Sequence, residues 1–471
     1  MSLPNTHFGA EYIGSLLSTP KNVFFAGIGG ISMCSIAHIT KLRGHNVTGY
    51  DRTPSKLTRD LEDEGITVWY ECDAHHVEDA DVFVYTVAIP PDCPEYVRAG
   101  ELGIPRISRA DFLGYIMSAY RRRIGVSGTH GKSTTTSMLE RIFTEAKLDP
   151  TVSCGAVMLD AHSAHVIGGE EYFIFESCEY MDSFLDFYPT TALILNIEMD
   201  HVDYFSSIEQ LETSFGRFAA RCGKDGYAVV NADSPSVMRS VADFAGTTVT
   251  FSVKDENADF FASDVTYDHG MARYTVMYKG EAAAKIALSV PGEHLVTDSL
   301  GAFAAAYVNG APAEAIADAL TKFNGAARRM EKCGETATGA AVYTDYAHHP
   351  TEIGVTLKTA LTMGYERVFA AFQPHTYSRT ARFFDDFADV LAKAGCAEVI
   401  LTDIYSARET DTMGVSSGLL ADAVKKKGAK ATYVPDLGDM SDYIAAKTGK
   451  GDMVLLVGAG DIVSCVKLMI G

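Results

Sequence analysis

The sequence predicts an α/β protein built of three domains. The chain has 471 residues, and at about 150 residues per domain this length favours about three domains. Apolar residues make up 47% of the chain, which is enough to fill globular cores. An apolar run followed by a glycine-rich turn and an amphipathic segment opens two units of the chain, and a third unit has strands that each precede a polar loop. We therefore expect parallel sheets with domains at 1–108, 109–325 and 326–471.

The first domain begins with "KNVFFAGIGGISMCSIAHITKLRGHNVTGYDR", residues 21–52. This stretch reads as a strand, a turn through Gly27, Gly29 and Gly30, a helix, and a second strand closed by Asp51. Such a βαβ unit opens a Rossmann-like domain. Ser32 stands where the dinucleotide-binding pattern has its third glycine, so the match is imperfect. We favour a helix N-terminus that receives a pyrophosphate over a tight turn without a ligand.

The second domain opens with "GVSGTHGKST", residues 125–134. The common phosphate-binding pattern requires a glycine where Val126 stands. Gly128 and Gly131 nevertheless allow a tight turn that aims N–H groups inward, Lys132 places an ammonium among phosphate oxygens, and Ser133 offers a hydroxyl to a divalent cation. A helix cap alone does not explain the lysine and the run of hydroxyl residues after it. The sequence thus predicts a P-loop ATPase-like domain with a parallel or mixed sheet, which closes with a helix beginning near Thr297.

Acidic residues and a histidine end two further predicted strands of this domain. Glu176 follows the apolar run in "FIFESCE", and Asp200 and His201 follow "ALILNIEM". Because parallel strands end at the same edge of a sheet, these side chains are expected beside the phosphate loop, where they can bind a cation. A solvated loop end is the alternative for each residue taken alone.

The third domain is predicted to be Rossmann-like, with polar loops after each strand. Arg328 and Arg329 lie at the expected domain junction, where an arginine can reach a transferring phosphoryl group; a solvated face is the alternative. His348 and His349 lack a second pair of ligands at metal spacing, so substrate binding or proton transfer is favoured, with a plain loop histidine close behind. Polar residues also follow two strands of this domain: Asp345, Tyr346, His375 and Arg379.

Composition narrows the partners and the compartment. The formal net charge is -21, from 61 acidic and 40 basic residues, which argues against nucleic acid and anionic membranes as partners. The nine cysteines are scattered and form no C-x-x-C pair, as in a reducing compartment. The first 22 residues lack the pattern of a secretory leader, and no apolar run reaches about 18 residues. We therefore expect a cytoplasmic protein that does not insert into membranes, either a monomer or a homodimer.

Taken together and in order, the motifs resemble the Mur ligases of peptidoglycan synthesis. The resemblance extends from about Asn22 to Ile462. It is carried by "FFAGIGGISM", "GTHGKSTTT", "FESCEYMDSF", "NIEMDHVDYF", "VPGEH", "GAARRMEKCGE", "TDYAHHPTEI", "FQPHTYSRT" and "VGAGDI". Within the family, the wording of "GIGGISM" and "DYAHHPTE" is similar to the branch that adds L-alanine.

This resemblance implies three domains and a ligase reaction. ATP would activate the carboxylate of UDP-N-acetylmuramate as an acyl phosphate, which the amine of L-alanine then attacks, with Mg²⁺ as the metal cofactor. Family members bind the UDP-sugar in the first domain and the ATP in the second, and close the third domain over both. The first glycine loop would accordingly hold the UDP pyrophosphate and not a dinucleotide.

The resemblance also assigns roles to single residues. The ATP phosphates would be wrapped by Gly128, Thr129, His130, Gly131, Lys132, Ser133 and Thr134. The Mg²⁺ ligands would be Ser133, Glu176 and His201. His294 and Asp298 fall in the motif beside the adenine, and Asp345 lies on the nucleotide face. The UDP-sugar would be bound by Gly27, Gly29, Gly30 and Asp51. Tyr346, His348 and Arg379 would meet alanine and the sugar carboxylate. The catalytic set would be Lys132, His201, Arg328, Arg329, His348 and Arg379.

Three alternatives stay open from the sequence. A recycling ligase that joins UDP-N-acetylmuramate to an intact peptide shares the ATP loop and the HHP motif. An NAD-dependent dehydrogenase built on the first glycine loop and Asp51 leaves Lys132, Glu176 and His201 without a role. A non-catalytic nucleotide-binding regulator would keep the loops without turnover.

Overall fold

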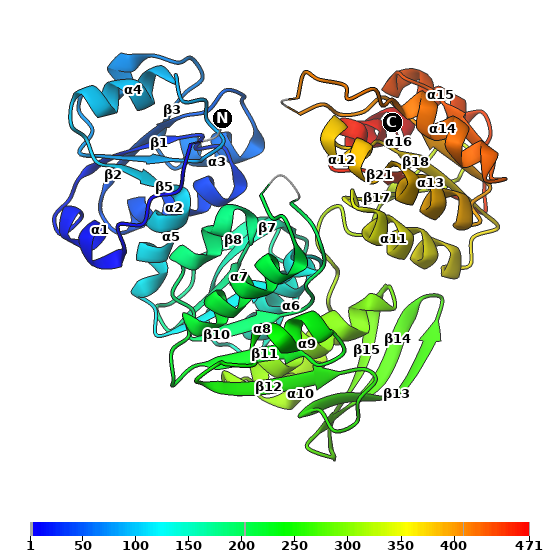
Figure 1. Ribbon diagram of the computed structural model, residues 1–471, viewed down its shortest axis with the longest axis horizontal. Helices are drawn as coiled ribbons and strands as arrows, with labels where there is room; N and C mark the ends of the chain where they lie inside the picture. The colour runs from blue at the N-terminus through cyan, green and yellow to red at the C-terminus, as the bar shows by residue number, and fades with distance from the viewer. Residues whose placement is uncertain (1–2, 202–203, 408, 471) are drawn as a thin grey trace. The chain divides into compact units, whose positions relative to one another are not determined.

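The computed structural model describes residues 3–201, 204–407 and 409–470, and contains three sheets (Figure 1). The chain divides into two compact units. The first unit comprises Met1–Ser263, Thr275–Lys285 and Thr297–Leu320, and the second comprises Asp264–Tyr274, Ile286–Val296 and Thr321–Gly471. Within the described ranges, no helix is both long enough and apolar enough to cross a membrane.

The N-terminal sheet is parallel and has the strand order β3-β2-β1-β4-β5. Val23 and Phe25 of β1 pack into one core with helices α2 and α5, whereas Phe24 packs on the other face with Phe83. Alternate residues are thus buried on opposite faces, as a doubly wound sheet requires. The strands are β1 Asn22–Ala26, β2 Asn46–Tyr50, β3 Thr67–Trp69, β4 Val82–Tyr85 and β5 Arg106–Ser108. The helices are α1 Ala10–Leu16, α2 Ile31–Leu42, α3 Lys56–Asp63, η1 Ala74–Val77, α4 Pro94–Glu101 and α5 Arg109–Ser118.

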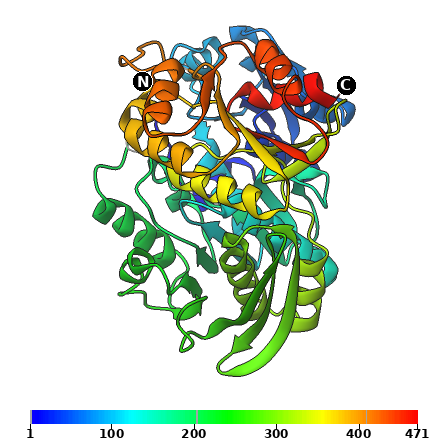
Figure 2. The ribbon, with the colours of Figure 1, turned by 90° about the vertical axis from the view of Figure 1, so that its right-hand side faces the viewer.

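The central sheet has ten strands in the order β15-β14-β13-β12-β11-β10-β6-β9-β7-β8. At its centre β6 runs parallel to β9 and β10, and near one edge β8 runs antiparallel to β7. The strands β13–β15 extend as the green hairpins at the bottom of Figure 2. The strands are β6 Arg122–Ser127, β7 Thr151–Met158, β8 Ser163–Val166, β9 Tyr172–Glu176, β10 Thr191–Ile194, β11 Tyr227–Asn231, β12 Thr247–Ser252, β13 Phe260–Asp268, β14 Met271–Tyr278 and β15 Glu281–Pro291. The helices are α6 Lys132–Glu145, η2 Tyr180–Asp186, α7 Ile208–Ala220, α8 Pro235–Ser240, α9 His294–Val308 and α10 Ala313–Thr321.

The C-terminal sheet has the order β16-β17-β21-β18-β19-β20, with β16 antiparallel to β17. Ala370 and Phe372 of β18 pack in one core, and Phe369 and Ala371 pack in the core of the opposite face. The strands are β16 Glu331–Glu335, β17 Ala341–Asp345, β18 Arg367–Phe372, β19 Glu398–Leu401, β20 Ala431–Tyr433 and β21 Asp452–Val457. The helices are α11 Pro350–Thr362, α12 Tyr377–Arg382, α13 Phe384–Lys393, α14 Ser417–Lys426, α15 Leu437–Ala445, η3 Asp461–Ser464 and α16 Cys465–Ile470.

The predicted fold class is therefore confirmed: two doubly wound sheets flank a mixed central sheet in chain order. The boundaries at 108/109 and 325/326 stay predictions. The helix expected to begin near Thr297 begins three residues earlier, at His294, shortly after Gly292, whose φ of 143° ends the preceding strand.

Candidate active site

The phosphate loop joins β6 to the N-terminus of α6. Gly128 and Gly131 have φ values of 140° and 84°, which side chains disfavour. A Cβ atom on Gly131 would also lie 2.7 Å from Oδ1 of the buried Asp298. The glycines at these two positions are thus required by the backbone, and the loop ends at a helix N-terminus, which favours anions.

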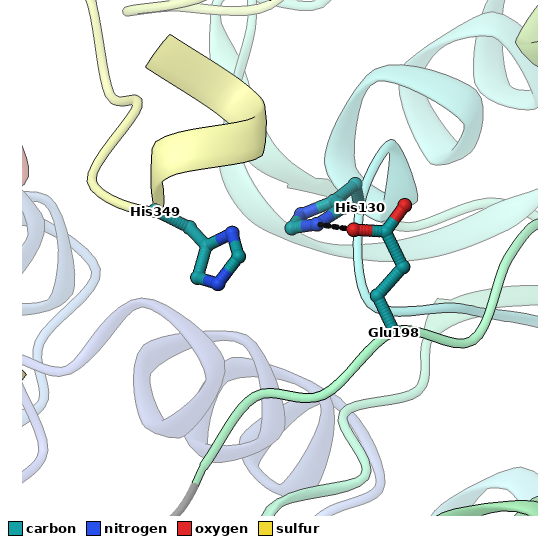
Figure 3. A group of neighbouring side chains, drawn as sticks. All are labelled: His130, Glu198 and His349. Atoms are coloured by element: carbon teal, nitrogen blue, oxygen red, sulfur yellow. Dashed lines mark ion pairs between the residues drawn. The ribbon is translucent and has the colours of Figure 1, made fainter. Parts of the chain in front are cut away.

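The loop is fastened to the segment that follows β10. The amide of His130 donates to Oδ1 of Asn196 (2.8 Å), and Nδ2 of Asn196 donates back to the His130 carbonyl (3.0 Å). Nε2 of His130 lies 3.4 Å from a carboxylate oxygen of Glu198 (Figure 3). His130 thereby joins the loop to the strand end that leads to Asp200 and His201.

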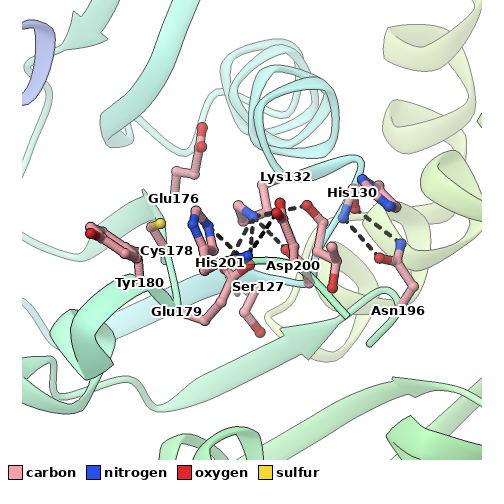
Figure 4. Close-up of polar contacts among 12 residues, drawn as sticks. Ser127, His130, Lys132, Glu176, Cys178, Glu179, Tyr180, Asn196, Asp200 and His201 are labelled. Atoms are coloured by element: carbon pink, nitrogen blue, oxygen red, sulfur yellow. Dashed lines mark hydrogen bonds and ion pairs between the residues drawn. The ribbon is translucent and has the colours of Figure 1, made fainter. Parts of the chain in front are cut away.

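Lys132 lies at the centre of a polar cluster (Figure 4). Its ammonium donates to the carbonyls of Gly128 and Thr129 and forms an ion pair with Glu179, with 3.1 Å between Nζ and Oε2. The Lys132 side chain is 13% exposed and that of Glu179 is 1% exposed. Burial alone would lower the Lys132 pKa, but Glu179, Cys178 and Glu176 outweigh it and raise that pKa above its usual value. The lysine is therefore a fixed cation at the phosphate loop.

Ser133, which follows Lys132 in α6, forms a hydrogen bond with Glu176. Oγ of Ser133 donates to Oε2 of Glu176 (2.8 Å), and the amide of Gly155 donates to the same oxygen (2.8 Å). A Cβ atom on Gly155 would lie 2.7 Å from the carboxylate. The structure thus brings together Ser133 and Glu176, two of the three predicted metal ligands.

His201, the third predicted ligand, lies beside Glu179 and Tyr180 (Figure 4). Its Nε2 is 3.8 Å from Oε1 of Glu179, and its ring packs against Tyr180 with centroids 4.7 Å apart. The backbone of His201 is left-handed (φ 48°), and its amide donates to Oδ1 of Asp200 (2.7 Å). A hydroxyl, two carboxylates and an imidazole thus lie around one lysine, and the hydroxyl and carboxylate oxygens are donors suited to Mg²⁺.

Glu179 is the functional candidate that the sequence analysis did not single out. It lies three residues beyond the end of β9, in a segment where Met181 and Asp182 both have positive φ values (53° and 55°). This kink interrupts any helical or strand pattern. The signal in the sequence is the second acidic residue of "FESCEY", three positions after Glu176.

The N-terminal glycine loop is closed by Asp51. Its Oδ2 accepts a hydrogen bond from the amide of Gly29 (2.8 Å), and its Oδ1 accepts one from the amide of Thr53 (3.2 Å). Gly27 has a φ of 83°, and Gly30 is the N-cap of α2. The four predicted UDP-sugar residues therefore form one turn, in which Asp51 holds the backbone.

Arg109, at the start of α5, is a second candidate that the sequence analysis did not identify. It lines a cavity of about 140 Å³ together with Thr86, Cys178, Tyr180 and Asn5. Its Nη1 atom donates to Oγ of Ser32 (3.2 Å). Burial lowers the Arg109 pKa, and no carboxylate ion pair of this side chain is found in the described part of the chain. The signal in the sequence is the position of Arg109 along the chain, between the last strand of the first sheet and the first strand of the second in chain order.

In the second unit, Arg328 and Arg329 gather around Tyr346. Their guanidinium carbons lie 4.7 and 5.4 Å from the centroid of the Tyr346 ring. Arg328 has a φ of 57° and donates to the carbonyls of Gly458 and Gly460. Arg328 thus has a clear part in holding the loop after β21.

The remaining C-terminal candidates follow β17 and β18. Asp345 accepts hydrogen bonds from the amides of Met330 and Ala347 (both 2.9 Å) and from Oγ1 of Thr356 (3.1 Å); burial raises its pKa, and Arg329 opposes that rise. Nδ1 of His348 lies 3.0 Å from the Tyr346 carbonyl.

His375 connects the two strand ends. Its ring lies 6.1 Å from that of His348, and its Nδ1 is 3.3 Å from Nη1 of Arg379. Burial, His348 and Arg379 lower the His375 pKa to about 4. His349 instead caps α11 and packs against Phe383. His348, Arg379 and Tyr346 are therefore near one another, whereas His349 has a structural role.

The nucleotide-base candidates lie along α9. His294 begins this helix and is exposed, and Asp298 is buried one turn later. Asp298 is the neighbour of Gly131 described above. Thr134, in the first turn of α6, is also buried. These placements leave the assigned roles as predictions.

Three protein-family models match consecutive stretches of the chain. The chain matches the Mur ligase family catalytic domain over residues 22–121, the Mur ligase middle domain over residues 126–306, and the Mur ligase glutamate ligase domain over residues 328–460. The chain belongs to the Mur ligase family.

Two curated relatives match this Mur ligase over nearly the full length of both chains. UDP-N-acetylmuramate–L-alanine ligase of Caldicellulosiruptor saccharolyticus is 42% identical over 448 residues, which cover 95% of this chain and 98% of that protein. The protein of the same name from Caldanaerobacter subterraneus subsp. tengcongensis is 43% identical over 444 residues, which cover 94% of this chain and 95% of that protein.

Solved structures agree with the fold of this Mur ligase. The crystal structure of UDP-N-acetylmuramate-alanine ligase from Thermotoga maritima has a TM-score of 0.81 at 26% identity, over 95% of this chain and 98% of that one. A murein peptide ligase from Psychrobacter arcticus has a TM-score of 0.71 at 24% identity, over 96% of this chain and all of the other. At that identity, the second likeness concerns the fold alone.

Proposed function

We propose that this Mur ligase joins L-alanine to the carboxylate of UDP-N-acetylmuramate, using ATP and passing through an acyl phosphate. The observation that carries the proposal is the buried Lys132–Glu179 pair at a glycine-rich loop, with Ser133, Glu176 and His201 beside it. The two relatives above bear the name of this activity at 42% and 43% identity.

ATP would bind with its phosphates at the N-terminus of α6. Lys132 is held by two loop carbonyls and Glu179, so its charge is already in place when the two anionic reactants meet. A preorganised cation in a water-poor site stabilises the charge that develops on the transferring phosphoryl group. The residues assigned to this step are Lys132, the loop from Gly128 to Thr134, and His201.

Mg²⁺ fits the oxygen-bearing side chains at this position. Ser133, Glu176 and Glu179 would supply the hydroxyl and carboxylate oxygens that Mg²⁺ prefers, and His201 would add an imidazole nitrogen. When bound, Mg²⁺ neutralises charge on the phosphate oxygens. The protein residues themselves keep the carboxylates oriented: Gly155 N–H holds Glu176, and Lys132 holds Glu179.

The UDP-sugar would occupy the turn formed by Gly27, Gly29 and Gly30, with Asp51 shaping the turn. We add Arg109 as the partner of an anionic group of this substrate, since this half-buried arginine lines a cavity together with Tyr180. L-alanine and the sugar carboxylate would be bound by Tyr346, His348 and Arg379. The arginines at the domain junction would be Arg328 and Arg329. His294 and Asp298 remain proposed nucleotide contacts, and Asp345 is proposed to shape the nucleotide face by holding backbone amides. We also propose domain boundaries at 1–108, 109–325 and 326–471. The protein is proposed to be cytoplasmic and to be a monomer or a homodimer.

Measuring phosphate release tests the proposal against its rivals. With ATP, Mg²⁺ and UDP-N-acetylmuramate present, L-alanine should support turnover and an intact tripeptide should not. Use of the tripeptide alone would indicate the recycling ligase. Release that does not depend on any amino acid or peptide would contradict both ligase assignments, and a hydroxy-acid-dependent change in nicotinamide absorbance would revive the dehydrogenase.

A further inference from the structure

The segment that precedes α1 runs across two parts of the first unit. We refer to residues 4–9 as the N-terminal arm. On one side the arm is tied to the first sheet and α5: the hydroxyl of Tyr85 donates to the Pro4 carbonyl (2.7 Å), and the amide of Thr6 donates to Oγ of Ser108 (3.0 Å). Asp111 of α5 accepts hydrogen bonds from the amides of Phe8 (2.7 Å) and Gly9 (3.1 Å). The arm is therefore a fixed element of this domain.

On its other side the arm contacts the segment that carries Glu179. Nδ2 of Asn5 donates to the carbonyl of Met181 (3.2 Å), and Nδ1 of His7 lies 2.5 Å from Oδ1 of Asp186. Met181 and Asp186 stand near the two ends of η2. The arm thus fastens the segment from Cys178 to Asp186 at two points, on either side of Asp182.

This segment requires such support because its backbone is strained. Met181 and Asp182 both adopt positive φ values, a conformation that costs non-glycine residues about 1 kcal/mol or more each and persists only where neighbours enforce it. The carbonyl that Asn5 holds belongs to one of these two residues. The strained turn directly follows Glu179 and Tyr180, so its shape sets where these two side chains lie.

In the contact between His7 and Asp186, the carboxylate is buried and the imidazole is exposed. The side chain of Asp186 is 6% exposed, whereas that of His7 is 66% exposed. Oδ2 of Asp186 has no hydrogen-bond partner among the described residues. Burial raises the Asp186 pKa to about 6, and His7 opposes this rise. His7 is thus the principal polar anchor for a carboxyl group that water barely reaches.

We propose that Asn5 and His7 are positioning residues, through which the N-terminal arm holds the Cys178–Asp186 segment in the shape that presents Glu179 to Lys132 and Tyr180 to His201. The inference rests on the proposed function for its catalytic readout. Neither residue touches the phosphate loop in the contacts described, and both act through the strained turn.

The test uses the full chain with N5A, H7A and the double variant N5A/H7A. Phe8→Ala is the matched control, because Phe8 is 47% exposed and packs on Tyr12, while the hydrogen bond that its backbone amide donates to Asp111 needs no side chain. H7N is the rescue variant, since its side-chain nitrogen can replace Nδ1 as the donor to Asp186. Thermal unfolding of each variant checks that the fold is intact.

We expect kcat for ATP-dependent phosphate release to fall at least about 10-fold in N5A/H7A, because misplacing a catalytic group by about 1 Å costs rates of this order or more. The KM for L-alanine should stay within about twofold, F8A should match the wild type, and H7N should recover most of the loss in H7A. A wild-type kcat in the double variant, or a loss shared equally by F8A, would overturn the inference.

A second readout does not depend on turnover. Amide hydrogen exchange of residues 178–186, followed by mass spectrometry, should be faster in N5A/H7A than in the wild type and unchanged in F8A. Unchanged exchange in the double variant would overturn the inference. If the wild-type protein releases no phosphate, the proposed function fails, and the exchange comparison still decides the role of the arm.

Discussion

The ammonium of Lys132 lies 3.1 Å from the carboxylate of Glu179, and both side chains are nearly removed from solvent. This pair links the phosphate loop to the strained segment after β9. A buried ion pair contributes little net stability, but breaking it by removing one partner is costly. The pair therefore offers a way to separate catalytic from structural effects.

Replacing Lys132 with methionine should reduce phosphate release about 100- to 1000-fold, the usual loss when a preorganised positive group is removed from a transition state. It should also destabilise the protein by about 3–5 kcal/mol, because Glu179 is left as a buried charge. K132M/E179Q should regain most of the stability and none of the activity. Denaturant unfolding and phosphate release measure the two effects, and an active K132M would remove this lysine from the mechanism.

Glu176 and Glu179 should both set the requirement for Mg²⁺. E176Q and E179Q are each expected to raise the Mg²⁺ concentration for half-maximal rate at least about 10-fold, since each loses a charged oxygen at the cation site. The control is E171Q, because Glu171 precedes the opposite end of β9 and pairs with Arg122. If E176Q alone responds, Glu179 serves only to hold Lys132.

Arg109 should report on the sugar nucleotide. R109A is expected to raise the KM for UDP-N-acetylmuramate at least about 10-fold, as expected for a lost charge-assisted hydrogen bond, while the KM for ATP stays within about twofold. R106A is the matched control, because Arg106 lies three residues earlier and packs over Tyr96. Equal changes in both KM values would place Arg109 in the structural core of the first unit and not in a subsite.

Asp345 should prove to be mainly structural. Its two oxygens accept three internal hydrogen bonds, and D345N loses at least one good acceptor, which costs about 1–3 kcal/mol for a buried group. We expect a lower unfolding midpoint with an unchanged KM for ATP. A raised KM for ATP at an unchanged midpoint would support the nucleotide role predicted from the sequence.

The stability of the C-terminal domain should fall in acid because of Glu398. Burial raises the pKa of this carboxyl group, but hydrogen bonds from Thr432, Tyr443, Lys447 and Lys430 outweigh it and lower that pKa to about 2. A lowered native pKa stabilises the fold above pH 4.5, and this contribution is lost as the pH falls from 4.5 to 2. The loss should amount to about 1–3 kcal/mol after allowance for solvent screening.

E398Q serves as the comparison for this pH dependence. Its unfolding free energy, measured by denaturant titration between pH 2 and pH 6, should lack the Glu398 contribution, so its curve should be flatter than that of the wild type. Parallel curves for the two proteins would exclude Glu398 as the source of the acid sensitivity.

The sequence predicted those parts of the site that depend on local pattern. The strand–glycine–helix units place Gly128, Gly131, Lys132 and Ser133 where the structure has them, because turn geometry and helix N-termini follow from neighbouring residues. The order of such units also predicted three α/β sheets. Glu176 and His201 were expected at one sheet edge on the same grounds, and they lie near Ser133 and Lys132 respectively.

The rest depends on contacts between distant segments. Glu179 pairs with Lys132 beside a kink at Met181 and Asp182, whose positive φ values are not predicted by local residue preferences. Asp51 and Asp345 have the residue types that ligand binding needs, yet both use their oxygens to hold nearby backbone amides. The N-terminal arm carries no motif, and its link to Asp186 spans 179 residues of sequence.

The most direct test of the central claim is a phosphate-release assay with ATP, Mg²⁺, UDP-N-acetylmuramate and L-alanine, run beside assays in which one component is omitted. We predict release only when all four are present, with one mole of alanine-linked sugar nucleotide formed per mole of phosphate. Equal release without UDP-N-acetylmuramate, or release supported by an intact tripeptide and not by L-alanine, would contradict the assignment.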